Sequence, residues 1–198
     1  MNKAELVAQI KNQILEVKAP GEPPFVLKSG LTSHYYLDCR RATLHDRSLR
    51  AIVDALWEKM MDVWNTTPFF HLYDIHAFGG PCVGADPIVG GLLYRASFHN
   101  SHGDTRGFLV RKEEKDHGKG GRVIGSMKPG DNCAFFEDVV TTGGTSLNAI
   151  DAVEEYGGKV RIVFAVVDRL MGAAEAFAKR GIPFYPLLTI HDLGVANE

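Results

Sequence analysis

From about residue 73 onward, apolar runs typical of buried strands alternate with segments of helical periodicity. The strand-like segments are "YDIHAFG", "RGFLVRK", "NCAFFED", "KVRIVFAVVD" and "IPFYPLLTI", and the helix-like segments are "GADPIVGGLLYRA", "TSLNAIDAVEEYG" and "GAAEAFAKRG". Parallel strands need long crossover connections, which are usually helices that cover the faces of the sheet. The alternation therefore predicts an α/β fold, with a parallel sheet flanked by helices.

The N-terminal part of the chain follows a different pattern. Residues 3 to 17 predict a helix that "APGEPP" ends, with one apolar face made of Leu6, Ile10, Ile14 and Val17. "FVLKSGLTSHYYLDCR" predicts two short strands around a Ser-Gly turn, and a second helix is expected from about Asp46 to Val63. Because no linker or repeat divides the chain, we expect one domain over 1–198, with residues 1–45 as an N-terminal appendage.

Composition excludes several classes of protein. The 198 residues carry a net charge of −2, so no basic field favours nucleic acid or an anionic membrane. The three cysteines, Cys39, Cys82 and Cys133, are far apart, which argues for a reducing cytosol and against a disulfide framework or a zinc site. The sequence shows neither a signal peptide nor an apolar run near the roughly 18 residues of a membrane span. We expect a cytoplasmic protein without nucleic-acid or membrane partners.

Three unusual loops follow predicted strands. They are "GGPCVGADP" at 79–87, "RKEEKDHGKGG" at 111–121 and "EDVVTTGGTS" at 137–146. Ligands of open α/β sheets bind beyond the carboxyl ends of the strands. The three loops should converge at one edge of the sheet, which makes that edge the candidate site.

The last of these loops has the composition of a phosphate site. Gly143 and Gly144 permit a tight turn, and the backbone amides of residues 141 to 145 would point outward at a helix N-terminus. The hydroxyls of Thr141, Thr142 and Thr145 add further donors. An ordinary capped helix is the alternative interpretation. The sequence contains neither G-x-x-x-x-G-K-[ST] nor G-x-G-x-x-G, so the usual nucleotide motifs do not account for the loop.

Two acids, Glu137 and Asp138, immediately precede this loop. Carboxylates would repel a phosphate unless they serve another group, such as sugar hydroxyls or a metal ion. A ribose 5-phosphate satisfies both requirements, with its phosphate on the amides and its 2- and 3-hydroxyls on the acids.

Four motifs resemble a known family. "FFEDVVTTGGTS" is similar to the phosphoribosyl-diphosphate (PRPP) signature of the type I phosphoribosyltransferases. "VRKEEKDHGKGG", "FVLKSGLTSHYYLDCR" and "VVDRLMGA" resemble the catalytic loop, the N-terminal segment and a C-terminal stretch of the orotate phosphoribosyltransferase family. The resemblance implies a type I phosphoribosyltransferase sheet with a small N-terminal hood of helix and strands over residues 1–45. It also implies the transfer of 5-phosphoribosyl from PRPP to orotate, giving orotidine 5′-phosphate and pyrophosphate in pyrimidine synthesis.

The same resemblance assigns roles to the loop at 111–121. It carries four cationic or titratable side chains within seven residues: Arg111, Lys112, Lys115 and His117. These would stabilise the departing pyrophosphate together with Mg²⁺ carried by PRPP, with no direct protein ligand for the metal, and Lys115 should have the largest effect. The family's loop reaches into the neighbouring subunit's site, which implies a homodimer. The alternative is a solvated surface loop, because nearby acids almost neutralise it.

Residues for the base come from three segments. Arg169 follows a predicted strand and suits a planar carboxylate, and the resemblance implies that it holds orotate with help from Thr141. A surface ion pair of Arg169 with Asp168 or another neighbour is the alternative. Lys28 resembles the family's lysine near the base and pyrophosphate. Tyr36 and Leu37 match positions along the orotate ring, although core packing is an equally open interpretation for both.

Some features depart from the family or leave other functions open. A lysine found in one common form of the 79–87 loop would fall at Gly84 here, so that cationic contact must be absent or come from elsewhere. His99 and His102 have no third ligand and are better explained as loop residues than as a metal site. The alternatives to the orotate enzyme are a phosphoribosyltransferase for another base and a PRPP-sensing regulator.

Overall fold

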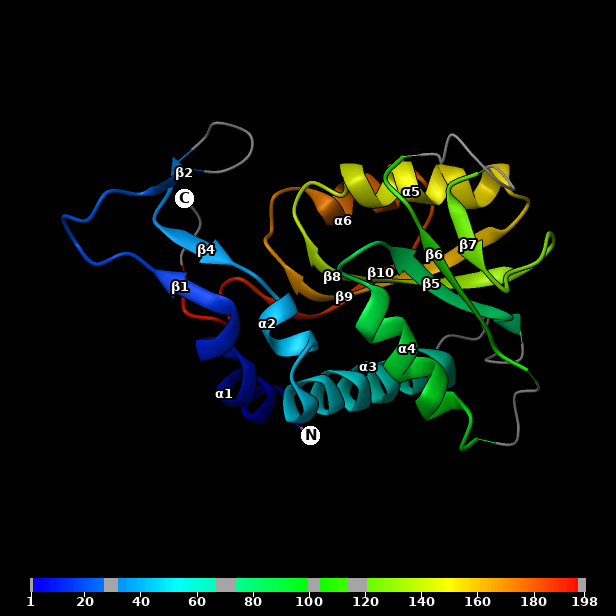
Figure 1. Cartoon of the computed structure of the whole chain (residues 1–198), viewed down its shortest axis with the longest axis horizontal. Helices are drawn as coiled ribbons and strands as arrows, with labels where there is room; N and C mark the ends of the chain where they lie inside the picture. Colours follow the sequence, from blue (N-terminus) through cyan, green and yellow to red (C-terminus); the bar gives the residue numbers. More distant parts are fainter. Residues whose placement is uncertain (1, 27–31, 67–73, 100–103, 114–120, 196–198) are drawn as a thin grey trace.

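The computed structural model describes residues 2–26, 32–66, 74–99, 104–113 and 121–195. Its centre is a six-stranded sheet in the order β10-β9-β8-β5-β6-β7 (Figure 1). Neighbouring strands from β10 to β6 are parallel, and β7 alone runs antiparallel, against β6. The strands are β5 (Ala77–Pro81), β6 (Arg106–Val110), β7 (Val123–Gly125), β8 (Asn132–Val140), β9 (Lys159–Asp168) and β10 (Phe184–Thr189).

Helices cover both faces of this sheet (Figure 1). The helices are α1 (Lys3–Ile14), α2 (Arg40–Thr43), α3 (Asp46–Thr66), α4 (Asp86–Ala96), α5 (Gly144–Glu155) and α6 (Ala173–Lys179). One face packs against α1, α3 and α4, and the other against α5 and α6. The predicted parallel sheet flanked by helices is confirmed, with the short edge strand β7 as its exception.

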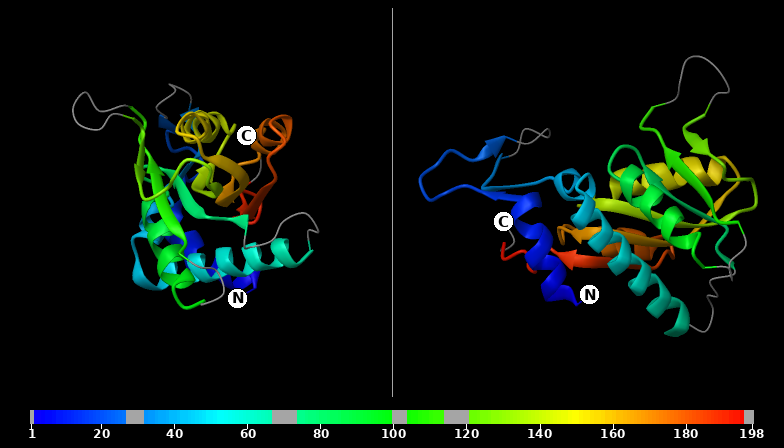
Figure 2. Two further views of the ribbon diagram at one scale, coloured as in Figure 1. Left: turned by 90° about the vertical axis from the view of Figure 1, so that its right-hand side faces the viewer. Right: turned by 60° about the horizontal axis from the view of Figure 1, so that its bottom comes forward.

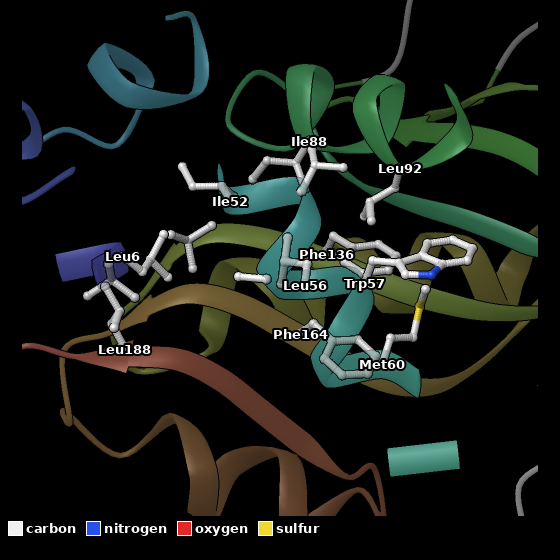
Figure 3. Close-up of a cluster of buried hydrophobic side chains, with 14 of the residues drawn as sticks. Leu6, Ile52, Leu56, Trp57, Met60, Ile88, Leu92, Phe136, Phe164 and Leu188 are labelled. Carbon is white, nitrogen blue, oxygen red and sulfur yellow. The ribbon is translucent and has the colours of Figure 1, made fainter. Parts of the chain in front are cut away.

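Neighbouring strand residues divide between two hydrophobic clusters. Phe136 on β8 packs with α3 and α4, and its neighbour Phe135 faces α5. Figure 3 shows the first cluster, in which Leu56 and Met60 of α3 meet Phe136 and Phe164 of the sheet. Both phenylalanines are fully buried, and their rings stack 5.5 Å apart. The strands are buried on both faces, which explains their nearly continuous apolar sequences.

The N-terminal helix ends earlier than its apolar spacing predicts. It begins with a capping box, in which Asn2 Oδ1 accepts from Glu5 N and Glu5 Oε2 accepts from Asn2 N. It stops at Ile14, and the chain continues as β1 (Leu15–Val17). The assignment of Val17 to a buried helical face is therefore wrong, since that side chain is 62 % exposed. Pairing of β1 with a later strand overrides the helical period.

The strands of the hood lie beside one end of the sheet (Figure 2). They are β1, β2 (Phe25–Val26), β3 (Thr32–Ser33) and β4 (Tyr35–Leu37). β1 pairs antiparallel with β4, and β2 with β3. In place of the two short strands expected after residue 25, the structure has three, β2, β3 and β4, while the Ser-Gly turn lies outside the described residues. In the described ranges, no helix is long and apolar enough to cross a membrane.

Candidate active site

A cavity of about 420 Å³ lies where the hood meets the carboxyl ends of β5 and β8. One wall is the hood segment from Tyr36 to Arg40, a second is the turn from Cys82 to Gly84 after β5, and the third is Glu137 to Val139 on β8. Helices α4 and α5, which follow β5 and β8, pack on opposite faces of the sheet. Open α/β sheets bind their ligands at such a topological switch point, where the connections from two neighbouring strands lead to opposite faces of the sheet. Two of the three predicted loops therefore meet here.

The turn at Gly84 is in close contact with Asp138. A Cβ atom built at position 84 would lie 2.4 Å from Asp138 Oδ1, a distance that real Cβ atoms do not show. A side chain at position 84 would therefore require the carboxylate of Asp138 to move. The sequence departure at Gly84 is thus coupled to the position of Asp138.

The paired acids differ in their surroundings. Glu137 is 7 % exposed and accepts a 2.8 Å hydrogen bond from Ser146 Oγ at the start of α5. Burial, with a further contribution from Asp138, raises the pKa of Glu137 to about 8. Asp138 accepts from Val139 N at 2.8 Å, and burial also raises its pKa. Both carboxyl groups border the cavity, and burial disfavours the charged form of each.

The Thr/Gly loop continues directly from these acids into α5. Gly143 has φ 81°, in the left-handed region that favours glycine, and its carbonyl accepts from Leu147 N in the first turn of α5. Thr142 and Thr145 are exposed, and Thr141 is half-buried. A helix N-terminus presents amides without partners inside the helix and a positive dipole end, and Ser146 in the first turn of α5 contacts Glu137. The geometry fits the predicted phosphate loop, while the roles of its individual residues remain predictions.

The hood contributes two charged residues that the sequence interpretation missed. Arg40 Nε and Nη2 donate to Asp38 Oδ1 and Oδ2 at 2.7 and 2.8 Å, and this pairing lowers the pKa of Asp38. Both residues line the cavity, which therefore contains three carboxyl groups and one guanidinium in its described lining. The short D-x-R spacing in "LDCRR" is the only sequence signal for this pair, and it is too common to identify a site.

Arg169 directly follows β9 and is not among the residues that line this cavity. Its backbone N–H donates to Val140 O at 2.9 Å, which places it next to the start of the Thr/Gly loop. The alternative of an ion pair with Asp168 does not describe the structure, because Asp168 Oδ1 accepts from Leu170 N. The guanidinium of Arg169 instead donates to Tyr35 Oη from Nε and Nη2, at 3.1 and 2.7 Å. Tyr35 was not among the predicted site residues.

The predicted base-contacting residues are only partly placed. Tyr36 is 37 % exposed and Leu37 is partly buried against the core, and both line the cavity. The ring of Tyr36 lies 5.7 Å from that of Phe25. Lys28 lies outside the described residues.

The 111–121 loop starts and ends on neighbouring strands. Arg111 N donates to Arg122 O, and Arg122 Nε donates to Arg111 O, both at 2.9 Å. Arg122 also donates to Asn148 of α5. Arg111 and Lys112 stand at the end of β6 and do not line the cavity, while Lys115 and His117 lie outside the described residues.

The carboxyl groups that line the cavity are potential ligands for a metal ion. Among the described residues, no three acidic, His or Cys side chains group closely enough to hold a metal ion. A magnesium ion at this edge of the sheet would need oxygen ligands from a bound substrate, with Asp38 or Asp138 adding hard donors.

Comparison with known proteins identifies the family and agrees with the fold. No protein-family model matches the chain. The orotate phosphoribosyltransferase of Rhodopirellula baltica is 41 % identical over 182 residues, covering 92 % of this chain and 91 % of the relative. That of Aquifex aeolicus is 37 % identical and covers 98 % of both chains. The crystal structure of the Mycobacterium tuberculosis orotate phosphoribosyltransferase with PRPP has a TM-score of 0.73 at 32 % identity, covering 98 % of this chain and 99 % of that one. This chain belongs to the orotate phosphoribosyltransferase family, a family of pentosyltransferases with the type I fold.

Proposed function

We propose that this protein transfers the 5-phosphoribosyl group of PRPP to orotate, releasing pyrophosphate and forming orotidine 5′-phosphate. The observation that carries the proposal is the direct succession of two cavity carboxyls, Glu137 and Asp138, and a helix N-terminus built from the Thr/Gly loop. A ribose phosphate needs both groups a few ångströms apart. The M. tuberculosis relative, whose structure holds PRPP, has the same fold.

In the proposed reaction, the bond between the anomeric carbon and the pyrophosphate oxygen breaks, and a bond from that carbon to a ring nitrogen of orotate forms. The proton of that nitrogen passes to the departing pyrophosphate. Positive charge develops on the ribose and negative charge on the pyrophosphate. Amides and hydroxyls of Thr141, Thr142, Gly143, Gly144 and Thr145 hold the 5-phosphate. This fixes the ribose with its hydroxyls on the acids of β8.

The carboxyls of Glu137 and Asp138 bind the 2- and 3-hydroxyls and oppose the positive charge on the ribose. Hydroxyls can donate to these carboxylates, which would compensate for their burial. Arg169, with Thr141, takes the carboxylate of orotate, and Tyr36 and Leu37 border its ring.

The pyrophosphate leaving group requires cations, and Arg40 is the one basic residue in the described lining of this cavity. Lys28, Arg111, Lys112, Lys115 and His117 are the proposed sources, with Lys115 the largest contributor. Mg²⁺ bound to PRPP would offset part of the negative charge shared by the pyrophosphate and the cavity carboxyls. The ion would be carried by PRPP, since no three acidic, His or Cys side chains of the described residues group closely enough to hold it.

We further propose that the active form is a homodimer in which the 111–121 loop of one subunit closes the site of the other. The position of Arg111 and Lys112 at the end of β6, outside the cavity lining, favours a loop that completes a site from a distance. The three cysteines are free thiols, which suits the reducing cytoplasm where we expect the reaction.

The test is the loss of orotate absorbance in the presence of PRPP and Mg²⁺, with adenine, hypoxanthine and uracil assayed in parallel by product chromatography. We expect turnover of orotate alone. Turnover of another base would retain the PRPP site and overturn the assignment of Arg169. Binding of PRPP without turnover of any base would indicate a regulator instead.

A further inference from the structure

The contact between Tyr35 and Arg169 joins the hood to the sheet at the edge of the candidate site. The two residues are 134 positions apart in the sequence. Tyr35 Oη accepts from Nε at 3.1 Å and from Nη2 at 2.7 Å, and the guanidinium carbon lies 4.8 Å from the centre of the tyrosine ring. Tyr35 itself is 6 % exposed and belongs to the main hydrophobic cluster. A buried, packed ring therefore fixes one edge of the guanidinium.

The partner of Arg169 differs in chemistry from the partners of several other arginines in the described residues. Arg40, Arg106 and Arg180 donate to carboxylates, which cancel their charge. The phenol of Tyr35 is a neutral acceptor, so it orients the guanidinium and leaves its positive charge for another anion. This is the arrangement needed by an arginine that must bind an anionic ligand.

The hydrogen bonds also select which donors remain. A guanidinium has five N–H groups, and Tyr35 occupies the one on Nε and one of the two on Nη2. The parallel pair at the other edge, one N–H on Nη1 and one on Nη2, can still meet a planar carboxylate with two hydrogen bonds. The position of the phenol thus determines the direction from which a carboxylate can approach.

We propose that Tyr35 is a positioning residue that holds Arg169 with its charge intact, so that the Nη1/Nη2 edge receives the carboxylate of orotate. This inference rests on the proposed function, because it takes Arg169 as the residue that binds that carboxylate. It adds a residue of the hood to the determinants of base specificity.

The experiment compares Tyr35→Phe with wild type in steady-state kinetics for both substrates. Phenylalanine keeps the packed ring and its cation–π contact and removes only the hydroxyl. We expect the KM for orotate to rise roughly tenfold, as for the loss of a hydrogen bond to a charged group, with the KM for PRPP within about twofold of wild type. Tyr185→Phe is the matched control, because Tyr185 also has a cation, Lys59, over its ring. It lies near the amino end of β10, whereas the candidate site is at the carboxyl ends of the strands.

Equilibrium binding of orotate to the Tyr35→Phe and Arg169→Ala variants, and to the double variant, tests the route of the effect. If Tyr35 acts through Arg169, the double variant binds orotate no more weakly than Arg169→Ala alone. Arg169→Lys, which keeps the charge and loses the planar fork, should show the same selective rise in the KM for orotate, and this checks the role of Arg169 on which the inference rests.

The outcomes separate this inference from the proposed function. Wild-type protein that binds no orotate would end both. If wild type binds orotate but Tyr35→Phe leaves the KM for orotate unchanged, the contact only tethers the hood to the sheet. The same conclusion follows if Tyr35→Phe raises the KM for both substrates equally and lowers the thermal midpoint. Additive losses in the double variant would also overturn the positioning role.

Discussion

At the scale of single residues, Asp138 is the clearest test of how the site binds ribose. Its carboxyl touches the Gly84 turn and borders the cavity, and burial raises its pKa. Asp138→Asn keeps an oxygen for the hydrogen bond from Val139 N and removes the buried charge, so the fold should lose no stability. We expect kcat/KM for PRPP to fall at least about a hundredfold, because an amide is a poorer acceptor for ribose hydroxyls.

Steady-state kinetics and thermal melts of Asp138→Asn check this expectation. Asp151→Asn, at an exposed position on α5, is the control and should behave as wild type. A fully active Asp138→Asn variant would contradict the role of the acid pair in holding the ribose.

Glu137 predicts a dependence of stability on pH. Its pKa is raised from an ordinary 4.5 to about 8, mainly by burial. Below pH 4.5 the carboxyl is protonated in both the folded and unfolded states. Between pH 4.5 and 8 the folded state keeps a proton that the unfolded state has released, so this group's contribution to stability is lost as the pH rises through that window.

Glu137→Gln should therefore gain thermal stability relative to wild type as the pH is raised from 5 to 8. Scanning calorimetry of the free protein across this range measures the difference, and Glu155→Gln on the exposed end of α5 serves as the control. A constant difference between Glu137→Gln and wild type at every pH would show that Glu137 titrates normally.

At the scale of elements, the start of α5 combines a stability requirement with a binding requirement. Gly143 has φ 81°, and a Cβ there would meet its neighbours at ordinary contact distances of 3.5 Å or more. Gly130, in the turn before β8, has φ 90° and open space around it. Alanine at either position should cost about 1 kcal/mol of stability for the left-handed backbone.

Only Gly143→Ala should also raise the KM for PRPP, by several-fold, because the amides after Gly143 belong to the proposed phosphate site. Chemical denaturation and PRPP kinetics of the two variants separate the two costs. An equal KM in Gly143→Ala and Gly130→Ala would place the phosphate elsewhere.

At the scale of the whole molecule, the proposed shared loop makes a prediction about mixed subunits. Lys115→Ala removes the loop function and leaves the cavity, while Asp138→Asn does the reverse. In an equal mixture that exchanges subunits, half of the dimers are mixed, and each contains one site with an intact cavity and an intact loop. Activity should recover to about a quarter of wild type under random exchange in a symmetric dimer.

The measurement is turnover after the two inactive proteins are unfolded together and refolded, with each refolded alone as the control. Activity that stays at the level of the separate variants would mean that each subunit uses its own loop, or that the protein acts as a monomer.

Local sequence determined the elements of the central sheet and one half of the site. β9 occupies the whole predicted segment from Lys159 to Asp168, because a strand buried on both faces reads as a continuous apolar run. The acids and the Thr/Gly loop are adjacent in sequence, so their meeting at one strand end required no knowledge of packing. The edge strand β7 was not predicted, because its three residues are too few to show the alternation of apolar and polar side chains that indicates a strand.

Contacts between distant segments were decided only by the tertiary structure. β1 ends the first helix because it pairs with β4, and the Gly84 turn meets Asp138 because β5 and β8 are neighbours in the sheet. The bond from Arg169 to Tyr35 exists because the hood lies over the end of β9. A sequence pattern reflects whether each segment is buried or exposed. Which segments contact one another depends on the free energy of packing the whole chain, and the walls of this site come from such contacts.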